Sequence, residues 1–250
     1  MSQESDPLKT LVIIQARMAS TRLPGKSLAP ILEKPMLYFV LERLKRLSHP
    51  VQLIVATSEE DADDPIEVWC NREKISCFRG SEEDVLDRFL KAARRHEGDV
   101  IVRITGDCPL IDPKIVDQAI DQFLEHYPDY DYVSNTLKRT FPRGLDVEVF
   151  KRRALERAHE EAFFTEEREH VTPFIWRHPE SFSLGELIYK EDVSDLRLTV
   201  DTEEDFLLIT KVLESLWPKN PAFSLDDLLT LIHAHPEWES LNAHVKQKGV

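Results

Sequence analysis

Apolar strand-like segments alternate with amphipathic helix-like segments through the first half of the chain. The alternation predicts right-handed crossovers and an α/β fold, a three-layer α/β/α arrangement around a mostly parallel mixed sheet. Continuous apolar runs of this kind are typical of strands buried on both faces. The strand-like segments are residues 11–14, 51–57, 76–78 and 100–104, and the helix-like ones are 36–47, 65–72, 82–95 and 113–126.

The length of 250 residues and the absence of a Gly/Ser-rich linker predict a single domain spanning residues 1–250. Residues 129–187 interrupt the strand and helix alternation. Residues 218–250 are expected to form a C-terminal helical extension, because Leu225, Leu228, Leu229 and Ile232 have helical spacing.

The formal net charge of −14 argues against nucleic acid as a partner, since such binding depends on neutralising phosphates. A small anion would need a local basic island. The three cysteines form no CxxC pair and cannot all pair with one another, which favours a reducing, cytoplasmic location. Residues 1–9 are polar, and no apolar run reaches membrane-spanning length, so neither a signal peptide nor a membrane partner is expected.

The loop after the first strand has the composition of a polyphosphate-binding loop. Small residues let backbone amides approach phosphate oxygens, and cations add charge. Ser20 stands where a P-loop would have its first glycine, which excludes that motif. A solvated turn with ordinary surface charges is the alternative. The small residues are Ala16, Ala19, Ser20 and Gly25, and the cations are Arg17, Arg22 and Lys26.

Ligands of such sheets gather beyond the carboxyl ends of the strands, here at Gln15, Thr57, Arg79 and Thr105. Asp107 follows Thr105 and Gly106, and a carboxylate there can hold a magnesium ion over the phosphates. An aspartate after a strand can instead cap a turn. Asp112, directly before Pro113, is the better helix cap.

A second carboxylate is expected from residues 196–200, an apolar segment that predicts a strand ending in Asp201. In the alternative, Asp201 or Thr202 caps the following helix, 206–216, and the acidic residues 203–205 complement its dipole. Taken alone, this segment favours the cap.

Three spaced motifs together resemble the CMP-ketodeoxyoctonate and CMP-acylneuraminate synthetases. They are the RLPGK loop at 22–26, Gly106-Asp107 with Pro109-Leu110, and the VDTxED segment at 200–205. The resemblance covers about residues 11–216 and is strongest to the branch typified by spore coat polysaccharide biosynthesis protein F. It implies a fold like that of the nucleotide-diphospho-sugar transferases and a magnesium-dependent cytidylyltransferase.

The resemblance also assigns roles to individual residues. It implies that Arg22 and Lys26 hold the CTP triphosphate, with Asp107 as third catalytic residue, and that Asp107 and Asp201 bind Mg²⁺. Ser81 is expected to cap a helix. The predicted nucleotide-binding residues are Gln15, Ala16, Arg17, Thr57, Arg79, Gly80, Thr105 and Gly106, of which Arg79 and Gly80 are placed near the base.

Two further segments, 134–150 and 167–173, match the spore-coat branch and predict the acceptor site at Arg143, Asp146 and His170. Lys138 and Arg139 add positive charge for a small acidic or phosphorylated sugar-like acceptor. Asp146 and Glu148 are expected on one face of a strand. Alternatively, Glu148 and Lys138 are solvated edge residues, and His170 is a surface or dimer contact. Residues 129–187 resemble the arm through which these synthetases dimerise, which predicts a homodimer.

The predicted reaction is transfer of CMP from CTP to that acceptor with release of pyrophosphate, in surface polysaccharide or glycan precursor synthesis. One alternative is a nucleotide-sugar-dependent glycosyltransferase, which would use the DxD element Asp129-Tyr130-Asp131. Another is a catalytically silent assembly subunit.

Overall fold

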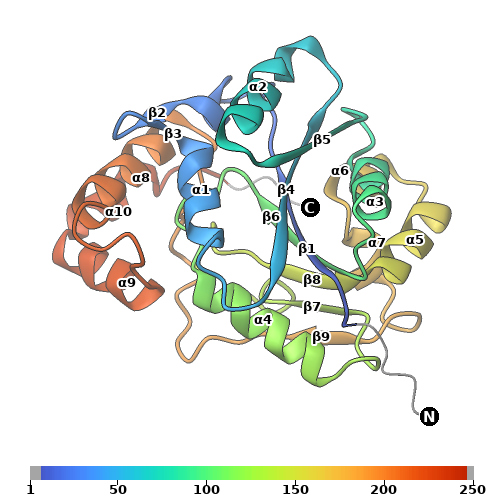
Figure 1. Cartoon of the computed structure of the whole chain (residues 1–250). Helices are drawn as coiled ribbons and strands as arrows, with labels where there is room; N and C mark the ends of the chain where they lie inside the picture. The colour runs from blue at the N-terminus through green and yellow to red at the C-terminus, as the bar shows by residue number, and fades with distance from the viewer. Residues whose placement is uncertain (1–6, 247–250) are drawn as a thin grey trace.

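The computed structural model describes residues 7–246, which form one mixed sheet flanked by helices (Figure 1). The strand order is β5-β4-β1-β6-β8-β7-β9. β8 is antiparallel to both of its neighbours, and all other pairs are parallel. The strands are β1 (Thr10–Gln15), β4 (Val51–Ser58), β5 (Ser76–Gly80), β6 (Val100–Thr105), β7 (Tyr132–Ser134), β8 (Glu148–Lys151) and β9 (Leu184–Glu186).

Helices cover both faces of the sheet because successive β1 side chains point to opposite sides. Val12 and Ile14 lie in one core with residues of α1 (Met36–Leu44), α2 (Asp64–Glu73) and α4 (Pro113–Glu125). Leu11 and Ile13 lie in a second core. That core includes residues of α3 (Val85–Arg95), α5 (Arg152–Glu161) and α7 (Pro173–Arg177), while α6 (Thr165–His170) packs on α3. The predicted three-layer α/β/α fold is confirmed.

The C-terminal helices dock beside α1 (Figure 1). Arg43 of α1 is fully buried and donates to the carbonyl oxygens of Ile111, Pro221 and Phe223 at 2.5, 3.2 and 2.7 Å. Burial lowers the pKa of Arg43 to about 10. The helices are α8 (Glu203–Leu216), α9 (Leu225–Ala234) and α10 (Pro236–Asn242), and the hairpin β2 (Pro30–Ile31) and β3 (Lys34–Pro35) lies nearby. Residues 1–6 of the N-terminal segment and 247–250 of the extension lie outside the described residues.

Residues 129–187 are part of the same sheet, to which they contribute β7, β8 and β9. Asp131 of the DxD element pairs with Lys151 at 2.9 Å. Lys151 lies opposite Val100, the first residue of β6, so the element sits at the sheet edge opposite Thr105. Its carboxylates are therefore remote from Asp107. The role of this segment in dimerisation stays a prediction.

Two local expectations were wrong. Residues 196–200 do not form a strand, because their backbone bonds to loops: Leu198 N donates to Arg143 O at 2.7 Å and Val200 N to Asp107 O at 2.9 Å. Helix α3 is capped by Asp84, which accepts from Asp87 N at 2.9 Å, and Ser81 instead closes the preceding turn by accepting from Asp84 N.

The predicted cap at Asp112 is confirmed, since its carboxylate accepts from Lys114 N at 3.0 Å. All three cysteines are free thiols, as expected. Within residues 7–246, no helix combines the length and apolar character that crossing a membrane requires.

Candidate active site

The carboxyl ends of β1, β4 and β6 meet at one edge of the sheet. Gln15 lies opposite both Ala56 and Thr105 in the strand register. Gly106 then donates its N–H to Gln15 O at 2.7 Å, and a Cβ at Gly106 would stand only 2.9 Å from that oxygen. The loop carrying Asp107 can approach β1 this closely only with glycine at position 106.

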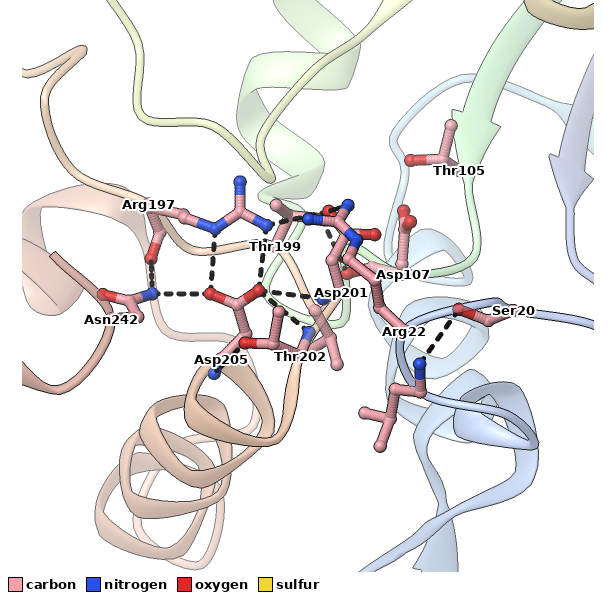
Figure 2. Close-up of polar contacts among 12 residues, drawn as sticks. Ser20, Arg22, Thr105, Asp107, Arg197, Thr199, Asp201, Thr202, Asp205 and Asn242 are labelled. Atoms are coloured by element: carbon pink, nitrogen blue, oxygen red, sulfur yellow. Dashed lines mark hydrogen bonds and ion pairs between the residues drawn. The ribbon is translucent and has the colours of Figure 1, made fainter. Parts of the chain in front are cut away.

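Lys26 lies between the two predicted metal ligands. Its Nζ is 3.0 Å from Asp107 Oδ2, 3.0 Å from Asp201 Oδ1 and 2.6 Å from Val200 O. Arg22 pairs with the other Asp201 oxygen at 2.9 Å (Figure 2). The fold thus brings together residues from three distant parts of the chain.

The charges in this cluster change the pKa values of Lys26 and Asp201. Burial acts to lower the pKa of Lys26, but the carboxylates of Asp107 and Asp201 outweigh it and raise that pKa. Burial acts to raise the pKa of Asp201, and Lys26, Arg197 and Arg22 lower it overall. Lys26 and Asp201 are therefore both charged at neutral pH.

Asp63 holds the loop after β1 in place, and the sequence analysis did not single out this residue. This carboxylate is almost fully buried and accepts from Met18 N at 2.6 Å, Thr57 Oγ1 at 2.9 Å and Ser58 N at 3.0 Å. Burial would raise its pKa, but these hydrogen bonds lower it. Gly25, at φ 76°, donates to Met18 O at 2.9 Å and turns the chain toward Lys26.

The remaining predicted nucleotide ligands differ in availability. Arg17 has no side-chain partner within residues 7–246. Thr57 is fully buried and its hydroxyl is bound to Asp63. Gln15 Oε1 accepts from Arg103 at 3.3 Å. The structure thus leaves Arg17 free to meet phosphate, whereas the Thr57 hydroxyl has a structural partner.

Arg79 is turned toward α2. It pairs with Asp64 at 2.5 Å and Glu67 at 2.9 Å, and it donates to the carbonyl oxygens of Ser58 and Glu60. The predicted contact of its guanidinium with a base would have to replace these bonds.

Arg88 is a second residue that the sequence analysis missed. Its side chain lies under Gly80, donates to Ser81 O at 3.1 Å and is 1% exposed. Its Nε has no hydrogen-bond partner in the described part of the chain, and burial lowers its pKa to about 10. Its place on the inward stripe of α3, three residues after Val85, was the available signal.

The predicted acceptor residues fall into two groups. Arg139 holds Asp146 through two bonds of 2.7 and 3.0 Å. Burial lowers the pKa of nearby Arg143, and the Arg139 charge adds to that effect. The Arg143 side chain has no hydrogen bond or ion pair within the range 7–246. The guanidinium of Arg143 is thus without a direct partner among these residues, although the charge of nearby Asp146 acts on it.

His170 belongs to the second group, around Glu148. Burial lowers its pKa, and Arg103 and Glu148 are among the charges that act on it. Glu148 is buried, pairs with Arg103 and accepts from Tyr132 Oη at 2.7 Å, so the solvated-edge alternative was wrong. Asp146 precedes β8 and does not share a strand face with Glu148.

The residues present fit a divalent cation. Asp107 and Asp201 converge on a single positive charge, that of Lys26. Thr202, with Asp205, forms the cap of α8, so the carboxylate of Asp201 is not used as a helix cap. No cluster of three or more His, Cys, Asp or Glu that could hold a metal occurs from residue 7 to 246, so phosphate oxygens and water would complete the shell.

Cys108 is buried beside this site, 3.1 Å from Thr105 Oγ1. Burial raises the pKa of its thiol well above the ordinary range. A buried thiol with a raised pKa is a packing group and not a nucleophile.

A family model for cytidylyltransferases matches residues 11–248 of the chain. An uncharacterized protein of Methanocaldococcus jannaschii is 37% identical, over 97% of this chain and 98% of that protein. Spore coat polysaccharide biosynthesis protein SpsF of Bacillus subtilis is 36% identical, over 91% of this chain and 95% of that protein.

Two solved structures resemble the fold. A cytidylyltransferase of Leptospira borgpetersenii superposes with a TM-score of 0.89 at 37% identity, covering 98% of this chain and all (100%) of that one. CMP:2-keto-3-deoxy-manno-octonic acid synthetase complexed with CTP gives a TM-score of 0.64 at 17% identity, over 83% of this chain and 99% of that one.

Proposed function

Because the chain belongs to the cytidylyltransferase family, we propose that it transfers CMP from CTP to a small anionic sugar-like acceptor with release of pyrophosphate. The observation that carries the proposal is the position of Lys26 between Asp107 and Asp201, with Arg22 beside them. An acceptor oxygen attacks the α-phosphorus, and the bond from that phosphorus to the pyrophosphate oxygen breaks.

Asp107 and Asp201 are the residues that would hold Mg²⁺ in this proposal. When bound, the ion would neutralise phosphate charge during the transfer. The Lys26 ammonium and a divalent cation would compete for the same oxygens, Asp107 Oδ2 and Asp201 Oδ1. With the cation bound, the Lys26 side chain would contact the phosphates and no longer the carboxylates. Arg22 and Lys26 stabilise the departing pyrophosphate, and Arg17 adds a third cation at the loop. This division of work needs no strong general base if the acceptor oxygen is already anionic.

CTP is the proposed donor for two reasons. The synthetase of similar fold was solved in complex with CTP. Near Gly80, the Nε–H of Arg88 lacks an acceptor among the residues described. Cytosine presents O2 and N3 as adjacent acceptors for a guanidinium, and because Arg88 is 1% exposed, the segment at Gly80 and Ser81 would have to move to admit the base. The base therefore belongs near the ends of β4 and β5, with the triphosphate over the loop after β1.

CTP is expected to bind more tightly in the presence of Mg²⁺ than after chelation, because two carboxylates and a triphosphate otherwise repel one another. Isothermal titration calorimetry with CTP, UTP, ATP and GTP, each with Mg²⁺ and with chelator, measures this directly. CTP should bind at least about tenfold more tightly than the others, a difference of about 1.4 kcal/mol. Equal affinities for all four would overturn the assignment to cytidylyl transfer. The same protein samples can then be screened with candidate acceptors, and release of pyrophosphate identifies those that react.

The acceptor is proposed to be acidic or phosphorylated and to approach from the side of Arg143. Arg143 has no ion-pair partner among the described side chains and lies next to Asp146, whose carboxylate is already paired with Arg139. An acidic protein that takes an acidic substrate needs such a local reversal of charge. His170 would contact a different part of the acceptor, because it lies near Glu148 and Arg103 and not beside Arg143.

Replacing Arg143 by alanine is expected to raise the acceptor KM about tenfold or more while CTP affinity stays unchanged. One charge-assisted hydrogen bond is worth about 1.5–3 kcal/mol. The measurement is steady-state kinetics with the acceptor found in the release screen, and Arg153→Ala, which removes an exposed arginine of α5, is the matched control. If KM and turnover were both unchanged in Arg143→Ala, the acceptor site would lie elsewhere.

The similarity to SpsF supports a role in polysaccharide precursor synthesis. We further propose a homodimer through residues 129–187. Two adjacent exposed phenylalanines in that segment, Phe163 and Phe164, are 87% and 71% exposed and suit such a contact. A cytoplasmic location is proposed from the three free thiols.

A further inference from the structure

A chain of buried hydrogen bonds links the last described helix, α10, to Asp201 (Figure 2). Asn242 ends α10 and is 4% exposed. Its Nδ2 donates to Arg197 O at 3.0 Å and to Asp205 Oδ1 at 2.8 Å. Both amide hydrogens of Asn242 therefore have acceptors, on two different segments.

Asp205 connects Asn242 to Arg197 and to the backbone of Asp201. Its carboxylate is fully buried and accepts from Arg197 Nε at 2.9 Å and Arg197 Nη2 at 2.8 Å. The same carboxylate accepts from the backbone N–H groups of Asp201 at 2.9 Å and Thr202 at 3.2 Å. It thus fixes both the guanidinium and the backbone on either side of the metal ligand.

Arg197 completes the link. Its Nη2 donates to Asp201 Oδ2 at 2.8 Å, while Oδ1 of the same carboxylate faces Lys26. A carboxylate with one oxygen held in this way presents the other in a fixed direction. Only Oδ1 is aimed at the position shared with Asp107.

Apolar contacts and hydrogen bonds both hold α10 against this segment. Trp238 and Leu241 of α10 pack against the neighbouring apolar core. A cavity of about 480 Å³ lies beside them, and its lining includes Arg143 as well as apolar residues. The Asn242 amide crosses from α10 to Arg197 at this cavity, and its hydrogen bonds add a directional constraint to the apolar contact.

We propose that Asn242 is a positioning residue for the metal site: through Asp205 and Arg197 it orients Asp201, so that α10 is a working part of the active site. This proposal rests on the proposed function, in which Asp201 binds the divalent cation. The proposal gives the C-terminal extension a role in metal affinity. If α10 only packed against the domain, its removal would affect folding stability alone.

The test compares Mn²⁺ affinity, measured by electron paramagnetic resonance of free Mn²⁺ with CTP present and acceptor absent. Asn242→Ala is expected to weaken Mn²⁺ binding about tenfold, the usual effect of removing a group that orients a metal ligand. Leu241→Ala removes apolar contact from the same helix. It should change Mn²⁺ affinity less than about twofold, even if it lowers the melting temperature as much as Asn242→Ala does. Asn242→Ser, which keeps one donor, should lie between wild type and Asn242→Ala.

Unchanged Mn²⁺ affinity in Asn242→Ala would overturn the proposal, as would an equal loss in Leu241→Ala. If neither Asn242 variant folds while Leu241→Ala does, the role is structural and the proposal is also overturned. Failure of the proposed function has a different signature: wild-type protein would show no CTP-dependent Mn²⁺ binding, or Asp201→Asn would bind Mn²⁺ as wild type does.

Discussion

Asparagine at position 107 or 201 is expected to lower turnover by about 100-fold or more, a loss of at least about 2.7 kcal/mol of transition-state stabilisation. Each substitution keeps the side-chain shape and removes one of the two carboxylate charges that converge on Lys26. Mn²⁺ affinity with CTP present should fall in parallel, since an amide oxygen is a weaker ligand for a hard cation than a carboxylate. Turnover is measured as pyrophosphate release.

Folding is the control for this pair. Both variants should keep a cooperative thermal transition, and Asp195→Asn, an exposed carboxylate on the segment leading to Asp201, should retain wild-type turnover. Full activity in Asp201→Asn would reduce that residue to a structural partner of Arg197 and leave Asp107 as the only protein ligand. Full activity in both would remove the proposed metal site altogether.

Lys26→Met is expected to have opposite effects on two measurements. Turnover should fall by about 100-fold or more, because no ammonium remains to stabilise the departing pyrophosphate. Mn²⁺ affinity of the nucleotide-free protein should rise, because a unit charge 3.0 Å from both carboxylate oxygens no longer competes with the ion. Methionine has similar length, so the site should keep its shape.

The matched control is Lys219→Met, which removes an exposed lysine far along the chain and should change neither quantity. Titration with Mn²⁺ before and after adding CTP separates the two effects. If nucleotide-free Mn²⁺ affinity fell in Lys26→Met, the carboxylates would depend on Lys26 for their placement, and competition between lysine and metal would be wrong. Unchanged turnover would exclude a role for Lys26 in leaving-group stabilisation.

Local patterns were enough to predict the sheet. The apolar runs before Gln15 and Thr105 identified two parallel strands, which the structure shows to be neighbours, and the small residues after Gln15 predicted the tight loop that follows. These predictions succeeded because burial on both faces and tight turns impose residue types on consecutive positions. The same reasoning was wrong for the segment before Asp201. Its apolar side chains are buried in the core that contains residues of α1, α8 and α9, while its backbone bonds to loops and not to a strand of the sheet.

The sequence by itself determined the α/β architecture, the loop after β1 and the candidates Arg22, Lys26, Asp107 and Asp201. Only the tertiary structure decided which charged side chains form ion pairs or hydrogen bonds with one another. Lys26 contacts Asp201 across 175 positions, Asp63 holds Met18 across 45, and Arg79 is drawn to α2. The spacing of residues along a strand or helix fixes which face a side chain occupies. Its partner depends on where distant segments pack, and that is set by the burial of the whole core.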